Sequence, residues 1–141
     1  MDQASGITRI LLIDDEQAVL DVTQSMLEWM GYEVTAISSS VEALDLFRRD
    51  PKRFDLIITD MVMPYLSGDN LARNIREIRL DMPVILYSGF HESMSDERAR
   101  ALGIKAFVTK PSRMKDLAEA VSWVLDGESA PEGRKINHHK P

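Results

Sequence analysis

Residues 10–16 read ILLIDDE, four aliphatic side chains followed directly by three acids. The aliphatic half has the length of a strand, and its lack of polar alternation predicts a strand buried on both faces, as in a parallel sheet. Three carboxylates crowded at the end of such a strand repel one another unless a cation lies among them. The stretch therefore predicts a central strand that delivers acids to one edge of a sheet.

Five runs of strand length, rich in aliphatic or β-branched residues, recur along the chain with helical spacing between and after them. The runs are residues 9–13, 33–37, 55–59, 83–87 and 106–109. Strands that alternate with helices form parallel βα units with right-handed crossovers. We therefore expect a doubly wound α/β domain with a five-stranded parallel sheet and five helices, the flavodoxin-like architecture.

The helical segments carry signals at their ends. Ser39 and Glu42 have the spacing of a capping box at the start of the second helix. Ser112, after Pro111, is expected to cap the fifth helix. The fourth helix, expected over residues 93–102, is the most polar and has few apolar positions, so it should be weakly anchored and free to shift.

The 141-residue chain has room for one domain, expected over residues 8–126, with a short extension at 1–7 and a polar tail or linker stub at 127–141. A net charge of -6 disfavours non-specific nucleic-acid binding. The absence of cysteine excludes disulfides and thiolate metal sites and fits a reducing compartment. No apolar stretch has the length of a membrane span, so we expect a cytoplasmic domain without direct membrane contact.

Polar side chains follow four of the predicted strands: Asp14 and Asp15 the first, Asp60 the third, Ser88 the fourth and Lys110 the fifth. Ligands of an open parallel sheet bind beyond the carboxyl ends of its strands, so these side chains converge if their strands are neighbours. Mg²⁺ binds through carboxylates, a carbonyl and waters. The pattern therefore predicts a Mg²⁺ site that includes Asp15 and Asp60.

Each charged group also has an ordinary explanation. The acids at 14–16 could only stabilise the start of the first helix, where negative charge favours the helix dipole. That explanation suits Glu16, but it does not account for Asp60. Lys110 could be a surface lysine, but a lysine between a buried strand and Pro111, facing three acids, is better explained as their counter-ion.

The stretches ILLIDDE, DLIITDMVMP, ILYSG and AFVTKP, in this order at the predicted strand ends, resemble the receiver domain of response regulators in two-component phosphorelay signalling. The resemblance covers residues 8–126. It implies that Asp60 accepts a phosphoryl group from a phosphohistidine of a histidine kinase or phosphotransfer protein. It also implies that Asp15, Asp60 and the backbone carbonyl of Val62 bind Mg²⁺, with Asp14 helping through water.

Phosphoryl transfer needs mainly positioning and charge neutralisation from a protein, which suits these roles. Asp60 is the expected nucleophile, Lys110 a second positive charge and the Ser88 hydroxyl a hydrogen-bond donor. Val62 and Phe90, two residues beyond Asp60 and Ser88, cannot orient water, so slow self-dephosphorylation is expected. The domain is thus expected to be a phosphoacceptor, not an enzyme that acts on other molecules.

The resemblance also implies a switch. Phosphorylation would draw Ser88 toward the phosphoryl group and turn Phe107 inward, which changes the face made by the fourth helix, fifth strand and fifth helix. For Phe107 the alternative is an ordinary core aromatic. A downstream protein, or a second copy in a phosphorylation-dependent dimer, would bind that face. The family suggests a cis bond between Lys110 and Pro111 that aims the lysine inward.

Other functions share this architecture. A flavodoxin-like FMN-binding module holds its flavin phosphate on amides and hydroxyls after the first strand, where this chain has acids. A metal-dependent α/β phosphatase usually needs a second acid two residues beyond its nucleophile and a cap, whereas Met61 and Val62 follow Asp60. A single-domain regulator and the receiver of a hybrid histidine kinase both fit the sequence.

Overall fold

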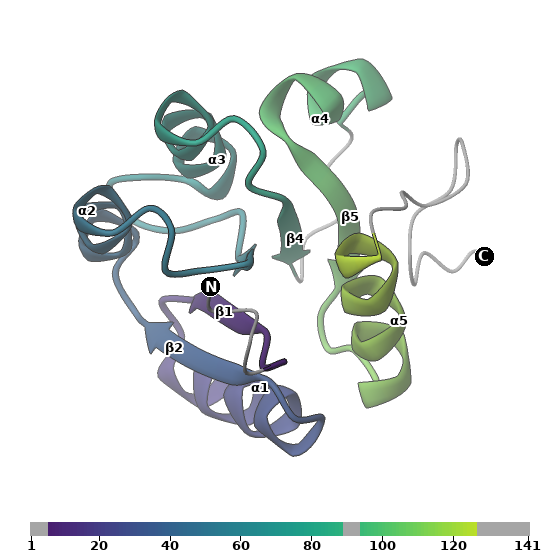
Figure 1. Ribbon diagram of the computed structural model, residues 1–141. Coiled ribbons are helices and arrows are strands. Elements are labelled where there is room, and N and C mark those ends of the chain that lie inside the picture. Colours follow the sequence, from purple (N-terminus) through teal and green to yellow (C-terminus); the bar gives the residue numbers. More distant parts are fainter. Residues whose placement is uncertain (1–5, 89–93, 127–141) are drawn as a thin grey trace.

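Five parallel strands form one sheet in the computed structural model, which describes residues 6–88 and 94–126 (Figure 1). The strands are β1 (Arg9–Ile13), β2 (Glu33–Ile37), β3 (Leu56–Thr59), β4 (Val84–Ser88) and β5 (Ile104–Thr109). Their order across the sheet is β2-β1-β3-β4-β5, and all four neighbouring pairs are parallel. The doubly wound sheet predicted from the sequence is confirmed, and its winding reverses between β1 and β3.

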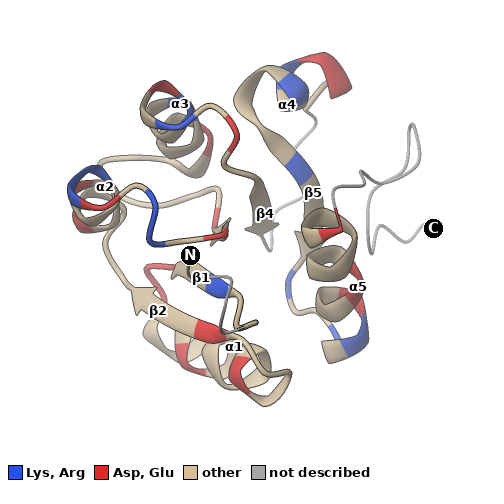
Figure 2. Ribbon diagram, viewed as in Figure 1, with Lys and Arg blue, Asp and Glu red and all other residues tan. Residues whose placement is uncertain are grey.

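Five helices within the described residues cover the two faces of the sheet (Figure 1). They are α1 (Gln17–Trp29), α2 (Ser40–Arg49), α3 (Gly68–Ile78), α4 (Asp96–Leu102) and α5 (Met114–Leu125). Buried side chains of α1 and α5 pack on one face, here called the α1/α5 core. Those of α2, α3 and α4 pack on the other, called the α2–α4 core. In Figure 2 the charged residues of α1 are all acidic.

β1 accounts for the continuous aliphatic run of residues 10–13. Ile10 and Leu12 lie in the α1/α5 core, whereas Leu11 and Ile13 lie in the α2–α4 core. Each of the four side chains is at most 1% exposed. Full burial of such a side chain stabilises the folded state by about 1.5–3 kcal/mol, so both cores depend on this strand.

Three strand boundaries differ from the predicted ones. β3 begins one residue later: the Asp55 N–H still donates to the Arg9 carbonyl at 2.8 Å, but the Arg9 N–H donates to the Asp55 carboxylate instead of to a backbone carbonyl. β4 spans 84–88 instead of 83–87, since Pro83 has no N–H to donate. β5 begins two residues earlier, because Gly103 ends α4 with a φ of 77° and turns the chain directly into the strand.

One predicted helix cap is confirmed and one is wrong. The Ser39 hydroxyl accepts a hydrogen bond from the Glu42 N–H at 3.2 Å at the start of α2. Ser112 does not cap α5, because the helix begins at Met114 and places Arg113 at the cap position without a side-chain cap bond. The Ser112 hydroxyl instead lies 3.5 Å from the Tyr87 hydroxyl.

α4 is short, and few groups hold it. It has seven residues, begins at Asp96 rather than at the predicted residue 93, which lies outside the described residues, and buries Ala99 and Leu102. Arg98 Nη2 lies 3.0 Å from Asp69 Oδ2 and so ties α4 to the first turn of α3. The motion of α4 stays a prediction.

No helix in the described part of the chain is long and apolar enough to cross a membrane. The expected domain bounds stay a prediction, and the tail at 127–141 and Phe90 lie outside the residues that the structure describes.

Candidate functional site

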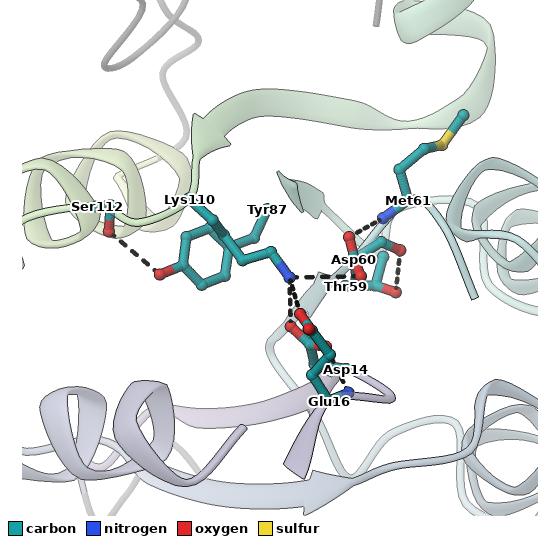
Figure 3. Close-up of polar contacts among 8 residues, drawn as sticks. All are labelled: Asp14, Glu16, Thr59, Asp60, Met61, Tyr87, Lys110 and Ser112. Atoms are coloured by element: carbon teal, nitrogen blue, oxygen red, sulfur yellow. Dashed lines mark hydrogen bonds and ion pairs between the residues drawn. The ribbon is translucent and has the colours of Figure 1, made fainter. Parts of the chain in front are cut away.

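The carboxyl ends of β1, β3 and β5 bring Asp14, Asp60 and Lys110 together (Figure 3). The backbone at these positions continues the sheet ladder one residue past the strands. The Asp60 N–H donates to the Ile13 carbonyl at 3.0 Å, and the Lys110 N–H donates to the Ser88 carbonyl at 2.9 Å. The hydrogen bonds of the sheet therefore fix the backbone positions of Asp60 and Lys110.

The Lys110 ammonium lies among carboxylates. Its Nζ is 2.8 Å from Asp14 Oδ2, 3.4 Å from Asp60 Oδ2 and 3.7 Å from Glu16 Oε1. The Lys110 side chain is 10% exposed. Burial alone would lower the pKa of Lys110, but the hydrogen bond and charge of Asp14, with the charge of Asp60, outweigh burial and raise the pKa. Lys110 thus stays charged.

The acids at 14–16 have three different positions. Asp14 is buried, and its Oδ1 accepts a hydrogen bond from the Glu16 N–H at 2.9 Å. Glu16 occupies the cap position of α1, makes no side-chain cap bond and is exposed. Asp15 is also exposed. Glu16 therefore lies at the start of α1, where an acid favours the helix dipole, and Asp14 accepts a hydrogen bond from its backbone.

Asp14, Asp15 and Asp60 can hold a metal ion. Each offers a carboxylate oxygen, and these oxygens lie within 4.8 Å of one another. Hard divalent cations such as Mg²⁺ prefer oxygen ligands of this kind. Burial raises the pKa of Asp60 and the charge of Asp14 raises it further, although Lys110 and the Met61 N–H favour the ionised form. Asp60 is therefore not fully compensated by Lys110, and a second cation fits the cluster.

The residues on either side of Asp60 hold its side chain and its backbone carbonyl through two separate hydrogen bonds. The Met61 N–H donates to Asp60 Oδ1 at 2.8 Å, and the Thr59 hydroxyl donates to the Asp60 carbonyl at 2.9 Å. Gly68, the first residue of α3, donates its N–H to the Met61 carbonyl at 2.7 Å. Val62 lies farther along the loop after β3 and is 58% exposed. The start of α3 therefore packs directly on the backbone of the acid.

Comparison with known proteins gives a direct family assignment. Residues 10–122 match the family model described as response regulator receiver domain. The chain belongs to this family. The response regulator SaeR of Staphylococcus aureus strain USA300 is 29% identical over 135 residues, which are 96% of this chain and 55% of SaeR. The receiver chain thus spans about half the length of the curated relatives it matches.

Solved receiver structures share the fold. A response regulator receiver domain protein from Clostridium thermocellum is 35% identical, with a TM-score of 0.79 over 86% of this chain and 96% of that one. The response regulator TrrA from Thermotoga maritima, solved in complex with Mg²⁺-BeF, is 31% identical, with a TM-score of 0.74 over 84% of this chain and 100% of TrrA. The chain is therefore a receiver domain of two-component systems.

The remaining predicted site residues of the receiver lie at or near the same edge. Ser88 is the last residue of β4, pairs with Thr109 and is half-buried. Phe107 on β5 is half-buried and packs against the α2–α4 core. The peptide bond between Lys110 and Pro111 is cis, as the resemblance to receiver domains implied.

Tyr87 was not singled out from the sequence, and Gly68 was expected only to shape the loop after Asp60. Tyr87 places its ring centroid 5.8 Å from the Lys110 Nζ. A Cβ built on Gly68 would lie 2.2 Å from the Asp60 carbonyl oxygen. The sequence did contain a signal for Tyr87, because it is the one aromatic residue of β4, between three aliphatic residues and Ser88. Gly68 carried only the general signal of a loop glycine.

Proposed function

We propose that Asp60 is the phosphoryl acceptor of this receiver domain, which works in the cytoplasm and takes the group from a phosphohistidine of a histidine kinase or phosphotransfer protein. The observation that carries the proposal is the cluster of Asp14, Asp15 and Asp60, whose buried members Asp14 and Asp60 lie beside the Lys110 ammonium, with Lys110 Nζ 3.4 Å from Asp60 Oδ2. Receiver domains are regulatory phosphoacceptors rather than enzymes that act on other substrates. The family therefore supports this role over an FMN-binding module or a phosphatase.

In the proposed step, a carboxylate oxygen of Asp60 attacks the phosphorus atom. The bond from phosphorus to the histidine nitrogen breaks, and the imidazole leaves with the electron pair. The product on Asp60 is an acyl phosphate. Lys110 supplies one positive charge to the phosphoryl oxygens, and the Ser88 hydroxyl donates a hydrogen bond to them.

Asp15, Asp60 and the Val62 carbonyl would hold Mg²⁺, with Asp14 helping through water. Bound there, the ion would supply positive charge for the phosphoryl oxygens beside the acids. Support comes from the carboxylate oxygens within 4.8 Å of one another. The likeness to TrrA, which was solved with Mg²⁺-BeF, adds to it.

Two surfaces serve the proposed partners. An apolar groove of about 530 Å³ lies beside Lys110, with Val19, Val22 and Met26 of α1 on one side and residues 110–112 on the other. Val22 is 60% exposed, so a phosphodonor protein that docks here gains apolar contact beside Lys110. The α4, β5 and α5 face carries the signal to a downstream protein or a second copy as Ser88 and Phe107 rearrange. The chemistry is the same in a single-domain regulator and in a hybrid kinase.

The test is incubation of the protein with acetyl phosphate and Mg²⁺, followed by intact mass measurement. We expect one added phosphoryl group, which hydroxylamine removes because acyl phosphates react with it. Chelation of the metal before the donor is added should prevent the gain. A protein that gains no phosphoryl group, or gains it equally well with chelator, would contradict the proposal.

Val62→Asn should accelerate loss of the phosphoryl group. Val62 is 58% exposed on the loop after Asp60 and offers no hydrogen bond to a water near the acyl phosphate. An amide there can orient such a water, and we expect hydrolysis faster by a factor on the order of ten. The decay is followed by mass after removal of the donor. Val41→Asn, at a 46% exposed position on α2, is the control, and equal decay of both variants would refute the explanation.

A further inference from the structure

The sheet register brings Tyr87 and Lys110 to the same face. Tyr87 on β4 pairs with Val108 on β5, and both lie in the α1/α5 core. Side chains alternate along a strand, so the residue two places beyond Val108 returns to that face. Lys110 is this residue and a diagonal neighbour of Tyr87, within reach of an aromatic side chain.

The ring of Tyr87 limits where Lys110 can go. The Nζ atom lies 5.8 Å from the ring centroid, within the range of a cation–π contact. Tyr87 is 4% exposed and the Lys110 side chain 10%, so little water separates them. Figure 3 shows the ring beside the lysine stem, with the ammonium pointing away from it toward Asp14 and Asp60.

The hydroxyl of Tyr87 contacts the loop that follows Lys110. It lies 3.5 Å from the Ser112 hydroxyl, so one side chain contacts both residues that flank Pro111. An aliphatic residue, as found elsewhere in β4, could fill the space but would offer neither contact. The tyrosine therefore contacts the lysine with its ring and the loop after β5 with its hydroxyl.

We propose that Tyr87 is a positioning residue for phosphoryl transfer, whose ring contacts the stem and the ammonium of Lys110 and holds that ammonium on the acid cluster. The inference rests on the proposed role of Asp60 as acceptor. Lysine has a flexible stem that must be ordered to place its charge. A buried ring on one side and two carboxylates on the other leave the ammonium few positions, and these face Asp60.

The test is a comparison of phosphorylation rates with acetyl phosphate and Mg²⁺, measured by intact mass. Tyr87→Leu should react about fivefold more slowly, the effect of a modest cation–π contact, because the Nζ atom lies near the outer limit of contact with the ring. Tyr87→Phe keeps the ring face and should react within about twofold of the wild type. In a Lys110→Met background, Tyr87→Leu should cause no further slowing, because there is no ammonium left to position.

The double variant separates positioning from a purely structural effect. Equal slowing by Tyr87→Leu with and without Lys110 would overturn the proposal, and so would equal slowing by Tyr87→Phe and Tyr87→Leu. If circular dichroism shows that Tyr87→Leu does not fold, Tyr87→Met replaces it, since methionine fills irregular space without a ring.

A matched control and the wild type complete the design. Tyr32 is a half-buried tyrosine directly before β2, at the opposite end of the sheet from the site. Tyr32→Leu should react at the wild-type rate, and slowing equal to that of Tyr87→Leu would overturn the inference. A wild type that gains no phosphoryl group overturns the proposed function, whereas a normal wild type with an unaffected Tyr87→Leu variant overturns only the role of Tyr87.

Discussion

Asp60→Asn is expected to gain no phosphoryl group from acetyl phosphate and Mg²⁺ under conditions in which the wild type gains one. An amide is a poor nucleophile toward phosphorus, and loss of the nucleophile of a covalent reaction lowers the rate by a factor on the order of 10³ or more. The amide is close in shape to the carboxylate. Because burial raises the pKa of Asp60, the fold already favours a neutral group there, and the variant should fold.

The measurement is a time course of intact mass, with thermal unfolding followed in parallel. Asp45→Asn, at a 61% exposed side chain on α2, is the control and should gain the phosphoryl group at the wild-type rate. A phosphoryl group on the Asp60→Asn variant at a comparable rate would show that a different residue is the acceptor. The Mg²⁺ dependence of the wild type would then need another site.

Gly68→Ala is expected to destabilise the fold and to impair the site together. The added Cβ would lie 2.2 Å from the Asp60 carbonyl oxygen and 2.9 Å from the Met61 Cα, and both contacts are to backbone. Backbone cannot move aside as a flexible side chain can, so the loop or α3 must shift. We expect a loss of about 3 kcal/mol in the free energy of unfolding, the upper part of the range for overpacking. Displacement of Asp60 should slow phosphorylation about a hundredfold.

Chemical denaturation and the phosphorylation rate measure the two effects. Without the close contact, alanine at the first helical position would stabilise α3, because alanine has the higher helix propensity. Gly31→Ala is the control: its Cβ would meet nothing within 4 Å, but its φ is 104°, so it should cost stability through conformation alone and leave phosphorylation unchanged. A Gly68→Ala variant as stable as the wild type would contradict the prediction, because it would show that a small shift of the backbone removes the clash.

The sequence was most informative where the signal is local. The four aliphatics of residues 10–13 predict a doubly buried strand, and the structure divides them between the two cores. The Ser39 cap depends only on spacing within one turn and is confirmed. The Ser112 cap is wrong, because the loop after β5 places the helix start at Met114, and that position depends on how the loop packs.

By itself, the sequence determined the parallel sheet and the delivery of acids and a lysine to its carboxyl edge, because strand pattern and strand ends are local properties. Tertiary structure alone decided that Asp14 is buried against Lys110 while Asp15 is exposed, since pairing across 96 positions sets that contact. It also placed Tyr87 beside the lysine and Gly68 against the Asp60 carbonyl. Such contacts depend on sheet register and helix docking, which bring together side chains that no sequence spacing relates.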